Sequence, residues 1–592
     1  MRFFSKTNAR HAGILALGAL CVACPTLRGQ DSDQAGKPFK ILRDSYAKAD
    51  SVQAASAYAK DAFYAENYAG AEPTARAGRT QIEAGFRQTF EQFGLRSLAG
   101  ADLNFRLIEN TATQGDGTVT GYYRLRIGKG RKRQSHYGQF STRVRDGLFT
   151  DDASGAAELT DFENAKGPVL FADKDEELDR AYYEKVVGHY RKSGANSDGK
   201  DCGITITLST RRYYLLDECT GDWRGLSRVS GREWTAGNRV IDSAVREEIV
   251  FDPSKKSLLR KRAGSPPETF LRSLEVERSD VRFGVDEALE GTLYRPVTAN
   301  AVRPGIVLVH GSGSQDRNGY ASIIAFLAER FAADGAIVLT YDKRGVGQSL
   351  GNWESAGFSQ LAADAKEGLM FLRSRNGVDP AHVGLAGSSQ AGWVVAKAIE
   401  NGADPAFTIL IGAAGSALTV EEQNLYNTEV RMNCAGIAKD DVALAIAQQR
   451  AFFAAKRNPK DAAALLEIST GAAKRPAIAD WLFPATAESS SPPQWYDVLE
   501  PDFDPLPIWK HYPGRAYFLF GTMDDSTPAK IAMERLKGLG DRTKTILLEG
   551  SQHLGLEAIG LCEGELEQAS RFHADFLPTL DGWLKEIAGE IR

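Results

Sequence analysis

One serine lies in a context that favours nucleophilic chemistry. Residues 382–392 read HVGLAGSSQAG, an apolar run followed by a turn, and a helix-like run follows at Trp393–Glu400. A serine at the tip of a sharp strand–turn–helix connection is exposed and strained, so its flanking residues must be small. Gly387 and Ala391 meet that requirement around Ser389, although a second glycine is more usual at the later position. The pattern predicts Ser389 as a nucleophile; the alternative is an ordinary turn serine.

A serine nucleophile needs a base that takes its proton and an acid that orients the base. Asp524 follows the strand-like run AYFLFG, and His553 follows the last strand-like run, Thr543–Glu549. The residues come in the order serine, acid, histidine, and each follows a strand-like run. We therefore predict Ser389, Asp524 and His553 as a catalytic triad, with Asp525 as the rival acid.

Acyl transfer also needs hydrogen-bond donors for the oxyanion of its tetrahedral intermediate. The backbone N–H of Gln390, directly after the serine, is the first predicted donor. The second is expected in the loop HGSG that follows the strand-like run 305–310, with Ser312 preferred and Gly313 next. We interpret His310 as an orienting residue and not as a second base.

These residues need a scaffold that brings them together. From residue 268 to residue 592, strand-like runs alternate with helical patterns, which predicts an α/β fold with a doubly wound, mostly parallel sheet. Sites in such sheets lie at the carboxyl ends of the strands, where the three predicted catalytic residues fall. The alternation breaks at residues 416–512, which we predict to be a helical cap over the site.

Two further domains are expected before the catalytic region, because a chain of 592 residues exceeds one hydrophobic core. Residues 39–157 begin with helical patterns, at 45–66 and 79–94, and continue with strands. Residues 178–252 indicate a small β-rich domain. Residues 253–267 are basic and rich in Ser and Pro, which predicts a linker.

The N-terminus predicts export. A positively charged start precedes the apolar run Ala12–Ala23, which is too short to span a membrane comfortably. We predict a signal peptide at residues 1–29 and a periplasmic or secreted protein. A lipid anchor at Cys24 is the disfavoured alternative, because the preceding residues match a lipoprotein box poorly. No later apolar run has membrane length, so no membrane span is expected.

Four of the six cysteines lie beyond the predicted signal and allow three pairings. Cys202 and Cys219 bracket two strand-like runs, which favours a hairpin disulfide and leaves Cys434–Cys562 as the second pair. No spacing indicates zinc, and no metal or organic cofactor is expected. The net charge of −5 does not favour nucleic acid, and the basic run 124–133 is interpreted as a solvated hairpin.

The C-terminal motifs also resemble a known family. Residues 270–592 resemble bacterial α/β-hydrolases of the dienelactone-hydrolase/prolyl-oligopeptidase-like clan, and within it the secreted carboxylesterase branch. The resemblance is carried by HGSGSQDR at 310–317, YDKRGVGQS at 341–349, AGSSQAGW at 386–393 and the stretches around Asp524 and His553. It implies a serine hydrolase that cleaves small-molecule carboxylic esters. It also implies that the Asp–Arg pairs of the first two motifs are structural and brace loops by ion pairs.

The N-terminal domain resembles the ketosteroid-isomerase-like (SnoaL-like) fold through the phrases at 62–65, 82–86 and 138–144. Such domains often pair, so a homodimer is a hypothesis. Two alternative functions stay open. A serine peptidase of the prolyl-oligopeptidase-like type shares the catalytic domain, but no propeller repeats precede it here. A non-catalytic binding protein on a hydrolase scaffold is the other, against which the complete set of site residues argues.

Overall fold

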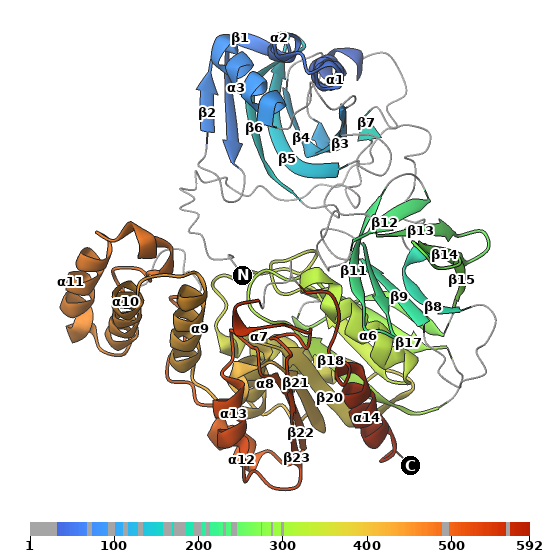
Figure 1. Cartoon of the computed structure of the whole chain (residues 1–592), viewed down its shortest axis with the longest axis vertical. Coiled ribbons are helices and arrows are strands. Elements are labelled where there is room, and N and C mark those ends of the chain that lie inside the picture. Colours follow the sequence, from blue (N-terminus) through green and yellow to red (C-terminus); the bar gives the residue numbers. More distant parts are fainter. Residues whose placement is uncertain are drawn as a thin grey trace.

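A computed structural model describes most of the chain in three units (Figure 1). The predicted signal peptide and Cys24 lie outside the described residues. The structure describes residues 32–67, 74–92, 101–110, 117–127, 134–157, 169–170, 185–192, 203–208, 213–228, 232–237, 246–273, 275–285, 288–297, 301–487, 496–563 and 569–591. Among these residues, no helix is both long enough and apolar enough to cross a membrane.

The first unit packs helices against one curved sheet, at the top of Figure 1. The helices are α1 (Ser32–Lys48), α2 (Ser51–Ala55) and α3 (Arg79–Gln92). The strands are β1 (Tyr58–Asn67), β2 (Thr74–Ala77), β3 (Ala101–Asn110), β4 (Gly117–Ile127), β5 (Gln134–Arg145), β6 (Leu148–Ala156) and β7 (Val169–Leu170). Their order in the sheet is β2-β1-β6-β5-β4-β3-β7. Phe39 of α1 packs against Phe105, Phe140 and Phe149 of the sheet and joins the two layers.

The predicted helix over residues 45–66 is wrong in its second half. From Tyr58 the chain is strand β1, which pairs in parallel with β6 and antiparallel with β2. Burial alternates there, because Ala62 and Tyr64 face the core while Phe63 is exposed. A period of two is the pattern of a strand, and the Ala-rich composition before it concealed the change.

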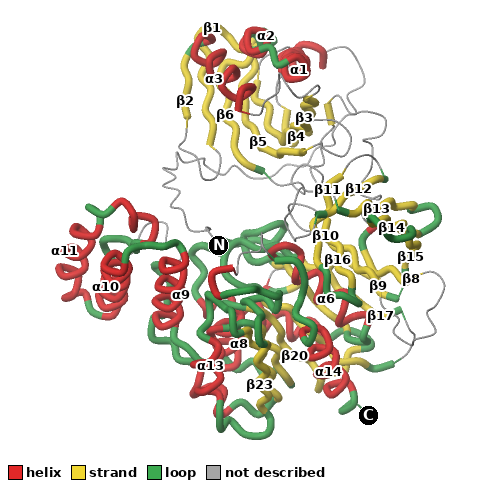
Figure 2. The backbone as a smooth tube through the Cα atoms, viewed as in Figure 1, coloured by secondary structure: helices red, strands yellow, loops and turns green. Residues whose placement is uncertain are grey.

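The second unit is a closed barrel of eight antiparallel strands in the order β10-β11-β12-β13-β14-β15-β8-β9 (Figure 2). The strands are β8 (Gly188–Lys192), β9 (Gly203–Leu208), β10 (Tyr213–Asp217), β11 (Trp223–Arg228), β12 (Glu233–Ala236), β13 (Glu247–Asp252), β14 (Ser257–Arg262) and β15 (Glu268–Arg272). Residues such as Tyr213, Trp234 and Phe251 fill its core.

The predicted linker at 253–267 is therefore wrong, and the β-rich domain does not end at residue 252. Strand β14 lies within this segment and pairs with both β13 and β15. Its basic residues have partners in the barrel: Arg260 is buried between Glu247 and Asp217, and Arg262 pairs with Glu268. A paired basic strand has the composition of a linker but contributes two ladders of backbone hydrogen bonds.

The third unit contains the predicted α/β sheet. Its eight strands are β16 (Val276–Phe283), β17 (Leu289–Pro296), β18 (Arg303–Val309), β19 (Ile337–Tyr341), β20 (Val378–Ser388), β21 (Phe407–Ile411), β22 (Arg515–Gly521) and β23 (Thr543–Leu548). They are ordered β16-β17-β19-β18-β20-β21-β22-β23. The first two strands are antiparallel, and the pairs from β19 to β23 are parallel.

Helices cover both faces of this sheet, and the side chains of successive residues in each strand point to opposite faces. Val307 and Val309 pack toward α7 (Phe358–Arg373), α8 (Ala391–Glu400) and α13 (Ala529–Leu536). Ile306 and Leu308 pack toward α6 (Ile323–Ala333) and α14 (Phe576–Ala588). Burial on both faces explains why these strands are continuous apolar runs in the sequence.

A helical segment is inserted between β21 and β22 and lies at one side of the domain (Figure 1). It contains α9 (Val420–Cys434), α10 (Lys439–Arg457), α11 (Ala462–Ala472) and α12 (Leu506–His511). A disulfide, Cys434–Cys562, joins the end of α9 to the segment after β23, as the sequence predicts. Cys219 is also disulfide-bonded, and its predicted partner Cys202 lies outside the described residues.

Candidate active site

Ser389 occupies a strained turn at the carboxyl end of β20. Its φ is +58°, a left-handed conformation that costs energy for a residue with a side chain. Its N–H donates to the Ile411 carbonyl oxygen over 3.2 Å, which anchors the turn to the end of β21. A Cβ atom at Gly387 would overlap the Val309 carbonyl and lie 2.6 Å from the Ala391 Cβ. The small residues of the motif are therefore required by contact between β18, β20 and α8.

Asp524 and His553 meet on the loops after β22 and β23. His553 Nδ1 lies 2.8 Å from Asp524 Oδ2 and 3.0 Å from Oδ1. The backbone N–H groups of Ser526 and Thr527 donate to Asp524 Oδ1 and fix the carboxylate. Burial alone would lower the pKa of His553, but the charge of Asp524 and its hydrogen bond outweigh burial and raise it.

The rival acid, Asp525, is bound elsewhere. Arg431 of α9 donates from Nε to Asp525 Oδ2 over 2.8 Å. Burial would raise the pKa of Asp525, but the charge of Arg431 lowers it overall. The structure thus brings Asp524 to the imidazole ring and Asp525 to the inserted helices.

Ser389 and His553 both adjoin the end of β21. Gly412, which follows the carbonyl that accepts the Ser389 N–H, has a φ of +55° and adjoins the histidine. A Cβ atom at Gly412 would overlap the His553 carbonyl and lie 3.1 Å from its Nδ1. In the part of the chain that the structure describes, the Ser389 hydroxyl forms no hydrogen bond with His553. Such contacts are often long in free enzymes and tighten with substrate.

The predicted oxyanion loop lies beside the serine. A Cβ atom at Gly311 would be 3.4 Å from both the Ser389 Cβ and the Ser388 carbonyl oxygen. Ser312 and Gly313 follow at the surface of the loop, and Gly313 has a φ of +81°. Within the described residues, the N–H groups of Ser312 and Gln390 donate to no other backbone group. These two predicted donors are therefore free to bind a substrate oxygen.

Comparison with known proteins identifies the fold around this site. Residues 306–558 match the Alpha/beta hydrolase family. The C-terminal part of this chain has the alpha/beta hydrolase fold. No curated protein matches the chain.

Solved structures of low sequence identity are similar to about half of this chain. Carboxyl esterase 2 from the mycorrhizal fungus Tuber melanosporum is 17% identical over 53% of this chain and 87% of that chain, with a TM-score of 0.32. Alpha/beta hydrolase GrgF from Penicillium sp. sh18 is 16% identical over 53% and 99%, with a TM-score of 0.33. Est1E from Butyrivibrio proteoclasticus is 13% identical over 52% and 98%, with a TM-score of 0.31.

Two ion pairs brace the loops of the hydrolase domain. Arg317 donates to Asp342 from Nη2 over 2.7 Å and from its backbone N–H over 2.8 Å. Arg344 donates to Asp364 of α7 from Nη2 over 2.6 Å. Asp316 instead accepts from the N–H groups of Asn318 and Gly319. The predicted bracing by both arginines is present, and Asp364 is a partner that the motifs do not contain.

His310 lies buried behind the oxyanion loop, with its ring centroid 4.6 Å from that of Tyr341. Burial and the charge of Lys343 lower the pKa of His310 to about 3. A neutral, enclosed imidazole fits the predicted orienting role.

Sequence reasoning missed Lys343. This lysine follows β19, and its side chain is buried beside the predicted oxyanion loop and Gln390. Its position two residues after the five buried residues of β19 was the available signal, because a charge there must enter the interior near the carboxyl edge of the sheet.

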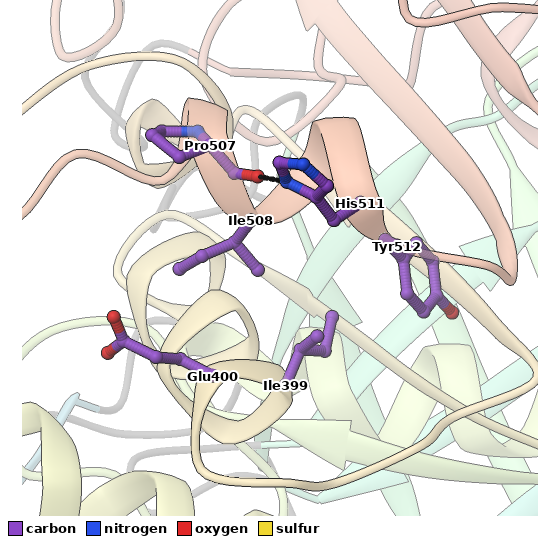
Figure 3. A pocket seen from close by; sticks show the side chains of 6 residues that line it. All are labelled: Ile399, Glu400, Pro507, Ile508, His511 and Tyr512. Atoms are coloured by element: carbon purple, nitrogen blue, oxygen red, sulfur yellow. Dashed lines mark hydrogen bonds between the residues drawn. The ribbon is translucent and has the colours of Figure 1, made fainter.

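A separate surface pocket of about 380 Å³ lies at the far end of α8 (Figure 3). Its lining comes from the C-terminal end of α8, from α12 and from the residue after α12: Ile399, Glu400, Pro507, Ile508, His511 and Tyr512. Because α8 begins beside Ser389 and is roughly 15 Å long, the pocket is remote from the serine. Over the described ranges, no cluster of His, Cys, Asp or Glu is placed to hold a metal ion.

Proposed function

We propose that the hydrolase domain is a serine carboxylesterase that acts through an acyl-enzyme on Ser389. The observation that carries the proposal is the Asp524–His553 pair at the same sheet edge as a serine held at positive φ. A histidine oriented through Nδ1 by a buried carboxylate presents Nε2 as a base. The strained turn exposes the hydroxyl of Ser389 to a substrate carbonyl.

In the first half-reaction, the Ser389 oxygen forms a bond to the ester carbonyl carbon while His553 Nε2 takes the hydroxyl proton. The carbonyl π electrons move to oxygen, and the N–H groups of Gln390 and Ser312 bind that oxyanion. Asp524 stabilises the imidazolium. When the carbonyl re-forms, the bond to the alkoxy oxygen breaks, and the alcohol leaves with the proton from His553.

In the second half-reaction, His553 removes a proton from water, whose oxygen attacks the acyl carbon. The intermediate collapses, the carboxylic acid leaves, and Ser389 recovers its proton from His553. All groups are returned to their starting state, so the cycle needs no other reactant than ester and water.

The proposal is tested by comparing the wild-type protein with Ser389→Ala on p-nitrophenyl esters of increasing acyl length and on aminoacyl-p-nitroanilides. Ester turnover that falls by at least 10³-fold in the variant supports the proposal. Ser388→Ala is the matched control and should stay within threefold of wild type. Faster turnover of anilides than of esters would reassign the protein as a peptidase. Folded wild-type protein that no fluorophosphonate labels would indicate a binding role.

A further inference from the structure

Lys343 is a buried cation without a direct counter-ion. Its side chain is 4% exposed. Among the described residues, no carboxylate oxygen lies within ion-pair distance of its Nζ. The nearby carboxylates are bound to other groups, Asp364 to Arg344 and Asp342 to Arg317. A buried charge that no carboxylate neutralises is costly, and its retention indicates a role beyond packing.

The ammonium group instead donates three hydrogen bonds at the oxyanion loop. Lys343 Nζ lies 2.9 Å from the Gly311 carbonyl oxygen, 3.1 Å from that of Gly313 and 3.0 Å from Gln390 Oε1. Three acceptors match the three N–H donors of an ammonium group. A neutral amine has two N–H bonds, so its lone pair would face the third oxygen. The geometry therefore fits the charged form.

The contact between Lys343 and the Gly311 carbonyl determines the direction of the Ser312 N–H, because both groups belong to one planar peptide. In a trans peptide, the N–H of one residue points opposite to the preceding carbonyl. Because the Gly311 carbonyl points at Lys343, the Ser312 N–H points away from it, on the other side of the loop. The same ammonium group donates to the side-chain oxygen of Gln390. The backbone N–H of Gln390 is the other predicted donor.

We propose that Lys343 is the positioning residue of the oxyanion hole. It joins the two segments that supply the donors, and it places a positive charge behind the developing oxyanion. This inference rests on the proposed esterase function. It assigns to Lys343 a contribution that grows as the carbonyl oxygen becomes negative, so the effect belongs to kcat more than to KM.

The test compares Lys343→Met with wild type, using Lys366→Met on α7 as the control lysine. Lys343→Met should lower kcat for an ester by about 10²–10³-fold with KM within threefold. Affinity for an alkylboronic acid, which forms a tetrahedral anion on serine, should fall by a similar factor. Lys366→Met should match wild type. Unchanged kcat and boronate affinity in folded Lys343→Met would overturn the proposal, as would a change in KM alone.

The pH dependence of kcat/KM adds a measurement that would not change if Lys343 served only in packing. Burial lowers the pKa of the Lys343 amine to about 7, and the charge of Asp364 opposes that shift. His310, which lines the same small cavity as Lys343 and Asp364, is neutral. The wild-type kcat/KM should therefore decline as rising pH deprotonates Lys343. That alkaline limb should be absent in Lys343→Met, and a limb of the same position in both proteins would count against the proposal.

Gln390→Met provides a second test of the proposal that remains available if Lys343→Met does not fold. It removes one acceptor of the ammonium and keeps the backbone N–H, so kcat should fall about tenfold with KM unchanged; wild-type kcat would contradict the proposal. The two hypotheses fail differently. If a fluorophosphonate labels wild type and Lys343→Met at equal rates, only the role of Lys343 is lost. If it labels neither protein and wild type turns over no ester, the esterase assignment is wrong and this inference falls with it.

Discussion

Two adjacent carboxylates at the proposed site have different tasks because their neighbours differ. Asp524 accepts two backbone N–H groups and contacts the ring of His553, which fixes the direction of the imidazole. Asp525 forms an ion pair with Arg431 on the inserted helix α9. At the scale of single residues, the proposed acid is Asp524 because its carboxylate faces His553. The carboxylate of Asp525 instead binds the inserted helix α9.

This division predicts unequal effects of two matched substitutions. Asp524→Asn should lower kcat/KM for an ester by about 10⁴-fold, because the histidine loses its anionic partner and its favoured tautomer. The base acts when neutral, and its pKa is raised in the native protein. Wild-type kcat/KM should therefore fall as pH drops through that raised value. Removing the Asp524 charge should move the acid limb to lower pH in a pH–rate profile.

Asp525→Asn is the control, since it replaces one oxygen of the neighbouring carboxylate by an amide NH2, as Asp524→Asn does. It removes the ion pair to Arg431 and should leave kcat/KM within tenfold of wild type, with the acid limb nearly in place. If Asp525→Asn proved as damaging as Asp524→Asn, the acid would have to be reassigned.

At the scale of elements, the sequence predicted best where one conformation satisfies several constraints at once. The turn at Ser389 needs small neighbours, a preceding apolar strand and a following helix, and all three can be recognised in residues 382–400. Strand β14 was misread because its Lys and Arg residues resemble a solvated linker. Their partners, such as Glu247 and Asp217 for Arg260, lie on other strands and are visible only in the fold.

The same limit applies inside the candidate site. Local patterns indicate Ser389, Asp524 and His553, because each follows its own strand. The contacts of Lys343 join residues 32, 30 and 47 positions away in the sequence. The choice of Asp524 over Asp525 depends on Arg431, which is 94 residues away. Contacts between residues so far apart in the sequence leave no periodic pattern that one sequence could reveal.

Helix α9 is held against the loops that follow β22 and β23 by non-covalent and covalent contacts. Tyr426 donates from its hydroxyl to the Asp524 carbonyl oxygen over 2.9 Å, and Arg431 pairs with Asp525. The disulfide Cys434–Cys562 ties the end of the helix to the segment beyond His553, across 128 residues of sequence. Disulfides persist in oxidising compartments, which supports the proposal that the protein is exported.

Replacing both cysteines, as in Cys434→Ser/Cys562→Ser, should lower the free energy of unfolding by about 3–5 kcal/mol, because the unfolded chain regains the freedom of a long loop. Thermal unfolding followed by circular dichroism would measure the loss. Ester kcat at 25 °C should stay within twofold, since Arg431 and Tyr426 still hold α9. A tenfold loss of kcat in the folded variant would show that the bond itself positions the site.

At the scale of the whole molecule, the barrel adds backbone hydrogen bonds to the loop that carries His553. Trp223 of β11 donates its N–H to the Ser570 carbonyl, and Gly221 accepts from Phe572. Phe572 forms a β-bridge with Leu556. The Leu556 carbonyl oxygen in turn accepts the Gln552 N–H over 2.8 Å. A ladder of isolated β-bridges and single backbone hydrogen bonds therefore runs from the barrel to Gln552, the residue before the histidine.

Trp223 secures this ladder by stacking on Phe572, with ring centroids 5.2 Å apart and planes 20° apart. We expect Trp223→Leu to lower ester kcat by at least tenfold and to speed hydrogen exchange in residues 550–558, because the support of the His553 loop is weakened. Both quantities are measured on the full chain, by kinetics and by mass spectrometry.

Trp234→Leu is the control, because Trp234 fills the barrel core against Tyr213 and Phe251 and does not stack on Phe572. It should destabilise the barrel by a similar amount while sparing kcat as long as the barrel stays folded. Equal losses of kcat in both variants would mean that the barrel acts only by being folded. Wild-type exchange and kcat in Trp223→Leu would show that the barrel and the hydrolase domain work independently, and the ladder would then be a contact without consequence for the histidine.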